Sequence, residues 1–193
     1  MPVLPRFREF TIWLRKEDPT HVTAKVVSGL YRAHARLRVA KRYQGILLSG
    51  VSETLANGYS VGVRLLLSYS AAESMGRAVD REVTTWEIRN AETLVPLRRI
   101  ANELVDWPMG LNNKMKNRLV EYVEHRTDNN RIVATALRHL MAHGHFAPAG
   151  KLALKKPDVS AVHALCDDLI AATERQFSHW FDQCLNGEPE KPN

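Results

Sequence analysis

The stretch "YSVGVRLLLSYSAAESMGRAVDRE", residues 59–82, decides the fold because it is long, strongly apolar and rich in small residues. Its length predicts a helix of about six turns, and its small residues allow neighbouring elements to approach closely. The longest apolar run within it is interrupted by Arg64 and Ser68 and is shorter than the roughly 20 residues of a membrane span. We therefore expect a packed helix of a globular protein, with no membrane as a partner.

Helical periodicity continues on both sides of this stretch. From Thr20, a suitable N-cap, apolar residues recur with the i, i+4, i+8 spacing of an amphipathic helix through Leu37. Asn57-Gly58 is typical of a turn or a helix end. Four more helices are expected: one with Pro96 in its first turn, one within 111–127, one over 131–143 capped by Asp128 or Asn129 and ended by Gly144, and a long one capped by Asp158 or Ser160 and ended by Gly187.

The fold class that follows is all-α. Only "FTIWL", residues 10–14, has the composition of a strand, and one strand does not make a sheet. We predict a bundle of about six helices with a basic N-terminal helix. The domain organisation expected is a basic helical segment over 1–44, a helical bundle over 45–187 and a flexible tail over 188–193.

Composition and cysteine usage favour a reduced, cytoplasmic protein. The 193 residues are 45% hydrophobic and 25% charged, as is ordinary for a globular domain, and no apolar signal-peptide region follows the N-terminus. Cys166 and Cys184 fall in one expected helix, about 27 Å apart, too far for a disulfide. No GxGxxG or GxxxxGK[ST] loop occurs, so ATP and dinucleotide chemistry are not indicated and no cofactor is implied.

The positive charge is concentrated in the first quarter of the chain. Residues 1–43 hold ten Lys or Arg and three acidic residues, a net charge of +7, whereas the rest has a net charge of −1. Such a distribution indicates an anionic partner, with nucleic acid first, or else a solvated helix face that aids solubility. The candidate RNA-binding residues on this helix are Arg32, Arg36, Arg38, Lys41 and Arg42.

Three histidines gather where the helix over 131–143 ends: His139, His143 and His145. His139 and His143 are spaced i, i+4, as a zinc pair would be, with His145 as a third ligand if the chain folds back. The glutamate that follows the first histidine in zinc peptidases is absent, since Leu140 and Met141 lie there. We therefore assign no metal ligands, and metal binding stays the weaker alternative.

Arg138 and His143 suit cleavage of RNA without a metal. A histidine with a pKa near neutrality can take a proton from a 2′-hydroxyl, and an arginine can hold the phosphate and its transition-state charge. On an ideal helix, however, a five-residue step turns the side chains about 140° apart. They converge only if the last turn unwinds at Gly144, or if a homodimer assembles the groove from two chains.

The stretch "LRHLMAHGHF", residues 137–146, resembles the signature of the HEPN superfamily (higher eukaryotes and prokaryotes nucleotide-binding domains). That signature is an Arg, a polar residue and a spacer before a His, and here Arg138 is followed by His139 and, after four intervening residues, by His143. Histidine replaces the asparagine commonest at the second position. An earlier apolar helix bearing Glu73 also fits, because many members place an acidic residue beside the motif.

The resemblance implies a dimerising helical bundle that acts as a metal-independent endoribonuclease, in toxin–antitoxin, defence or RNA-processing roles. Arg138 and His143 would then be catalytic, with His139, Glu73 and His145 in support. Other members are non-catalytic modules that bind nucleotides, nucleic acids or proteins, which is the alternative for this chain. An antitoxin, or a separately encoded nucleotidyltransferase, would be the protein partner.

Overall fold

The all-α prediction is confirmed by a computed structural model that describes residues 4–20, 22–108, 110–145 and 156–187. The tail expected at 188–193 lies outside these residues. The helices are α1 (Phe7–Glu17), α2 (Ala24–Arg42), α3 (Glu53–Ala78), α4 (Leu94–Val105), α5 (Asn113–Val123), α6 (Arg131–Ala142) and α7 (Lys156–Leu185), with two short 3₁₀ turns, η1 (Val83–Thr85) and η2 (Ala91–Thr93). None of the helices so described is long and apolar enough to cross a membrane.

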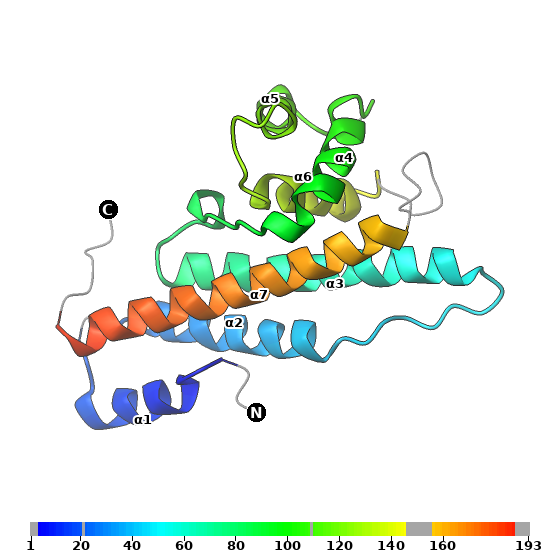
Figure 1. The fold of residues 1–193 in the computed structure, drawn as a ribbon. Helices are drawn as coiled ribbons and strands as arrows, with labels where there is room; N and C mark the ends of the chain where they lie inside the picture. Colours follow the sequence, from blue (N-terminus) through cyan, green and yellow to red (C-terminus); the bar gives the residue numbers. More distant parts are fainter. Residues whose placement is uncertain (1–3, 21, 109, 146–155, 188–193) are drawn as a thin grey trace.

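Three long helices form the body of the bundle. α3 packs against α2 on one side and α7 on the other, and α4, α5 and α6 lie over the middle of α3 and α7 (Figure 1). α1 lies at the opposite side, near the C-terminal end of α7 (Figure 1). Among these short helices, α6 packs directly on α3, so the end of α6 lies beside that helix.

α3 is a central element of the core and begins earlier than expected. The helix end predicted at Asn57-Gly58 was wrong, because α3 begins at Glu53 and passes through both residues. The Ser52 side chain accepts a hydrogen bond from the backbone N–H of Leu55 (3.3 Å) and so caps the helix well before Asn57-Gly58. Gly58 is buried, so tertiary packing overrides the turn preference of this dipeptide.

Other helix starts also differ from the expected caps. α2 is capped by Thr23, not by Thr20, and α6 follows Asn130 instead of Asp128 or Asn129. α7 begins at Lys156, which places Asp158 in its first turn, where the carboxylate is fully buried beside Arg99. Of these starts, that of α2 has a side-chain cap, because Thr23 accepts a hydrogen bond from the backbone N–H of Val26 (3.3 Å).

The stretch with strand composition, residues 10–14, is part of α1. Phe7 and Phe10 are spaced for one face of a helix and pack on the aromatic side chains of α7. Phe10 lies 5.9 Å from Phe177 and 5.7 Å from Phe181, ring centroid to centroid, with edge-to-face geometry. The aromatic residues thus serve the core here, and α1 is joined to the bundle through them.

Gly29 lets α2 and α3 pack closely. A Cβ atom at this position would lie 2.8 Å from Cβ of Ala78 and 3.3 Å from its Cα. Replacing Gly29 by leucine should therefore lower the free energy of unfolding by about 1–3 kcal/mol, the usual cost of overpacking. Urea unfolding measures this, with Ala35→Leu on the exposed face of α2 as the control, expected within about 0.5 kcal/mol of wild type. Equal stabilities of the two variants would contradict the close contact.

Candidate functional site

The end of α6 has the geometry expected at Gly144. Gly144 adopts a left-handed conformation (φ +70°), and its N–H donates to the Met141 carbonyl (3.1 Å). The N–H of His145 reaches back to the Leu140 carbonyl (2.8 Å), which completes a Schellman motif. The chain therefore folds back after Gly144, so that His145 returns toward the helix.

This motif brings the three histidines into a row. The ring centroids of His139 and His143 lie 4.5 Å apart, and those of His143 and His145 lie 6.4 Å apart. His143 is exposed, whereas His139 and His145 are half-buried. Gly110 makes room for the row, because a Cβ there would come within 2.7 Å of the His145 ring.

Arg138 is held by the acidic residue of α3. Its Nη2 donates to both carboxylate oxygens of Glu73, at 3.0 and 3.1 Å. Its guanidinium also lies over the ring of Tyr69, 5.6 Å from the centroid, and the Tyr69 hydroxyl lies 2.9 Å from Oγ1 of Thr135. The side chains of Arg138 and Glu73 remain 32% and 26% exposed, so the pair is reachable from solvent.

The structure thus brings Glu73 beside Arg138, while His143 lies further along the same helix end. Among the described residues, the hydrogen bonds and ion pairs of Arg138 go to Glu73, and none goes to His143. His139 lies between the two, and the charges of both lower its pKa. Within one chain, therefore, Arg138 and His143 are not hydrogen-bonded to each other, and His139 lies between them.

Tyr69, Thr135 and Gly110 also belong to this site, and sequence reasoning missed them. Tyr69 lies one turn before Glu73, and Thr135 lies three residues before Arg138, so each shares a helix face with a motif residue. That spacing is the signal that would have found them. Gly110 lies in the loop before α5, and no spacing connects it to α6.

Burial lowers the pKa of His139 below its usual value. The positive charges of His143 and Arg138 act in the same direction, and a backbone hydrogen bond with Gly110 acts against them. The neutral ring is therefore favoured near neutral pH. A neutral His139 can donate one hydrogen bond and accept another beside the Arg138 charge.

The same shift predicts a pH dependence of stability. Since the pKa of His139 is lower in the folded chain than the unfolded reference of 6.5, the unfolded state binds more protons as the pH falls below that value. The contribution of the neutral His139 ring to the free energy of unfolding is thus complete above pH 6.5 and is lost as the pH falls. His139→Gln should reduce the loss of unfolding free energy between pH 7.5 and 5.5, as measured by urea unfolding. His34 and His163 have pKa values lowered by burial too, so part of the loss should remain. An identical loss in variant and wild type would contradict the shift.

Other chemistries have less support from the residues present. Burial raises the pKa of Cys166 to about 12 and that of Cys184 to about 11, so neither thiol forms a reactive thiolate at neutral pH. Within the ranges that the structure covers, no group of three or more His, Cys, Asp or Glu side chains is arranged to hold a metal ion. The histidine row is thus a cluster of titratable groups beside a cation.

The basic helix α2 lies as expected, but its charges differ in availability. Arg32 donates to Ser28 (2.9 Å), Arg36 binds Ser74 on α3, and Lys41 pairs with Glu174 on α7. Arg38 and Arg42 are exposed and make no hydrogen bond or ion pair with the part of the chain that the structure covers. These two are the residues of α2 most available to an anionic partner.

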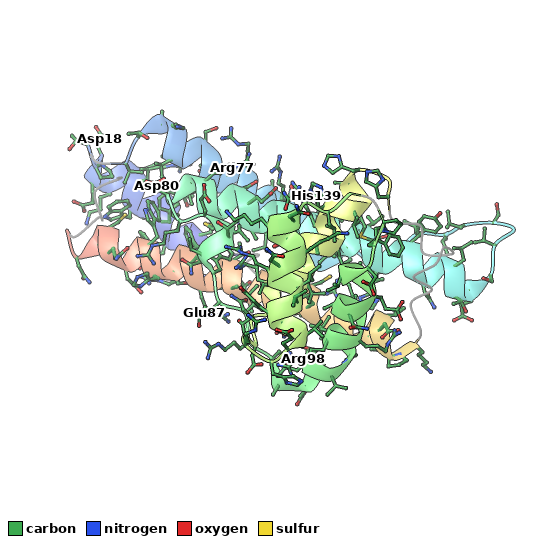
Figure 2. All side chains as sticks on the ribbon, turned by 90° about the horizontal axis from the view of Figure 1, so that it is seen from above. Asp18, Arg77, Asp80, Glu87, Arg98 and His139 are labelled. Carbon is green, nitrogen blue, oxygen red and sulfur yellow. The ribbon has the colours of Figure 1, made fainter. Side chains whose placement is uncertain are left out.

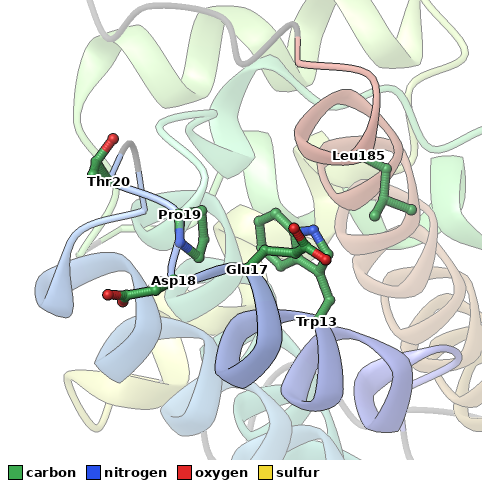
Figure 3. Close-up of a pocket in the computed structure, with 6 residues that line it drawn as sticks. All are labelled: Trp13, Glu17, Asp18, Pro19, Thr20 and Leu185. Carbon is green, nitrogen blue, oxygen red and sulfur yellow. The ribbon is translucent and has the colours of Figure 1, made fainter.

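A wide hollow of about 620 Å³ lies at the other end of the molecule, between the α1–α2 turn and the end of α7 (Figure 3). Trp13, Pro19, Thr20 and Leu185 line it together with two carboxylates, Glu17 and Asp18. A phosphate would be repelled by these carboxylates. The hollow therefore does not extend the site at the end of α6.

The end of α6 therefore combines a half-exposed guanidinium, a carboxylate that holds it, and a row of imidazoles. Figure 2 shows His139 on the same edge of the bundle as Arg77 of α3. Such groups can bind a phosphate and move a proton beside it.

Comparisons of this chain with models of protein families, with curated proteins and with solved structures found no match.

Proposed function

We propose that this chain is a metal-independent endoribonuclease of HEPN type. The observation that carries the proposal is the Arg138–Glu73 pair beside the row of His139, His143 and His145 at the end of α6. An RNA phosphate would dock on Arg138, whose exposed edge is free to donate while Glu73 holds the other. The resemblance of the Arg–His motif to the HEPN signature supports the same reaction.

The proposed reaction is an attack by the 2′-oxygen of RNA on the adjacent phosphorus. His143 takes the proton of the 2′-hydroxyl, the new P–O bond forms, and the bond to the 5′-oxygen of the next nucleotide breaks. Arg138 stabilises the charge on the phosphoryl oxygens in the transition state. The products are a 2′,3′-cyclic phosphate and a 5′-hydroxyl, and the 5′-oxygen leaves with a proton.

A homodimer would supply what one chain lacks. Arg138 and His143 do not bond to each other within the chain, so a groove formed by two helix ends would place the His143 of one copy opposite the Arg138 of the other. The second His143, in its protonated form, would then give the proton to the leaving 5′-oxygen. Arg38 and Arg42 on α2 would hold the RNA backbone in a manner that weakens with salt.

The alternative is a non-catalytic module that binds nucleotides, nucleic acid or a protein partner. It is favoured by one observation, the absence of a direct Arg138–His143 contact within the described residues of the single chain. In that case Arg138 would bind a phosphate, and His143 would move no proton. The two functions differ in whether RNA is cut.

Incubation of the purified chain with a mixed RNA pool in EDTA separates them. We expect cleavage, with 2′,3′-cyclic phosphate and 5′-hydroxyl ends identified by end-specific labelling. Light scattering on the same preparation should show a dimer. Binding of RNA without cleavage by a folded dimer would contradict the nuclease and support the module.

A further inference from the structure

A second cavity adjoins the proposed site on the far side of Glu73. It encloses about 200 Å³ and is lined by Tyr69, Glu73, Arg77, Glu82, Val83 and Thr84. Tyr69, Glu73 and Arg77 are spaced one turn apart on α3, and the other three come from the 3₁₀ turn η1 and the residue before it. Since Glu73 also binds Arg138, this carboxylate separates the cavity from the phosphate position proposed above.

The wall formed by η1 is held in a fixed place. Gly76 allows the chain to turn back onto α3, because a Cβ there would lie 2.6 Å from the Arg81 carbonyl oxygen and 3.2 Å from the Val83 nitrogen. Asp80 adopts a left-handed conformation (φ +53°), and the Arg81 N–H donates to the Gly76 carbonyl (2.8 Å). The indole of buried Trp86 then donates to the Arg81 carbonyl (3.0 Å). The cavity is therefore a built feature of the fold.

The rim of the cavity offers a donor and an acceptor of opposite charge. Arg77 is exposed and makes no hydrogen bond or ion pair with the residues that the structure describes. Glu82 is exposed as well, and its carboxylate accepts a hydrogen bond from the Thr84 hydroxyl (2.9 Å). Because the two charges are not paired with each other, both are available to one ligand that carries acceptors next to donors.

We propose that this cavity binds a guanine base of the RNA. Guanine presents the O6 and N7 acceptors, which suit an arginine, directly beside the N1–H and N2–H donors, which suit a carboxylate. Adenine lacks the O6 acceptor, and uracil and cytosine lack the N7 and O6 pair. Tyr69 and Val83 provide the apolar wall that a base needs. The assignment rests on the proposed function only in that the base would lie next to the phosphate on Arg138.

Binding of guanosine monophosphate tests this without requiring cleavage. Calorimetry with the full chain in EDTA should show it to bind at least about fivefold more tightly than the adenosine, cytidine and uridine monophosphates, the discrimination of a good two-point contact. Arg77→Met and Glu82→Gln should each remove that preference. Glu87→Gln, an exposed carboxylate outside the cavity, should keep it.

A variant without His143 separates the guanine site from the proposed nuclease. His143→Ala should bind guanosine monophosphate with the same preference, since His143 does not line the cavity. Equal or undetectable binding of the four nucleotides, or an unchanged preference in both cavity variants, would overturn the guanine site even if RNA is cut. A guanine preference in a chain that cuts no RNA would establish the guanine site and contradict the proposed nuclease activity.

Discussion

Replacing His143 by alanine should reduce RNA cleavage in EDTA by on the order of 10²–10⁴-fold, because general acid–base catalysis contributes that much to such reactions. The ring is exposed at the end of α6, so its removal should leave the unfolding midpoint unchanged. The backbone N–H of residue 143 still donates to the His139 carbonyl in the variant, and the helix end stays closed. Cleavage is measured on a labelled oligoribonucleotide under single-turnover conditions.

Arg138→Ala should lose on the order of 10²–10³-fold, the usual effect of removing one donor that stabilises a transition-state charge. Arg138→Lys should restore little of the lost cleavage. An ammonium lacks the planar guanidinium, which can donate to Glu73 and to a phosphate at the same time. His179→Ala, which removes an exposed imidazole from α7, is the matched control and should keep wild-type turnover. Wild-type cleavage in His143→Ala or in Arg138→Ala would show that the assignment of the pair is wrong.

Periodicity predicted most of the fold, because helices report their buried face locally. The amphipathic spacing of α2, the apolar length of α3 and the glycine that ends α6 are each contained in one short stretch. The strand composition noted at residues 10–14 was misleading, because the structure there depends on contacts with residues distant in the sequence. The strand composition of residues 10–14 is outweighed by the contacts that Phe7 and Phe10 make with α7, more than 160 residues away along the chain.

The candidate site was predictable only in part for the same reason. Arg138, His139 and His143 are visible as a local motif, whereas the contact with Glu73 depends on how α6 packs across α3. The family resemblance suggested an acidic partner, but no spacing in the chain fixed which turn of α3 would face the arginine. The cavity beside Glu73 depends on the close approach at Gly76, and the room for His145 depends on Gly110.

A second large effect is expected at Asn130, which no sequence pattern singled out. Its fully buried side chain accepts a hydrogen bond from the Tyr122 hydroxyl (2.6 Å) and donates to Oγ1 of Thr93 (3.0 Å) and to the Asn90 carbonyl (3.3 Å). Burial raises the pKa of Tyr122 to about 12, so the hydroxyl stays a proton donor at all ordinary pH values. One amide therefore joins α5, the η2 turn and the start of α6.

Asn130→Ala should lower the free energy of unfolding by about 2–4 kcal/mol, because it leaves the buried Tyr122 hydroxyl without its acceptor and the Asn90 carbonyl without that donor. Urea unfolding measures the loss. Asn117→Ala, on the exposed side of α5, should stay within about 0.5 kcal/mol of wild type.

The pairwise contribution can be isolated with Tyr122→Phe. In the wild-type background this change removes the donor of a 2.6 Å hydrogen bond and should be destabilising, whereas in Asn130→Ala the hydroxyl has already lost its acceptor and its removal should cost little. The two losses should therefore fall short of additivity by about 1 kcal/mol. Additive losses would mean that the hydroxyl finds another partner when Asn130 is absent. Because Asn130 lies directly before α6, which carries Arg138 about two turns further on, a shortfall would also show that the helix bearing the motif is anchored through this amide.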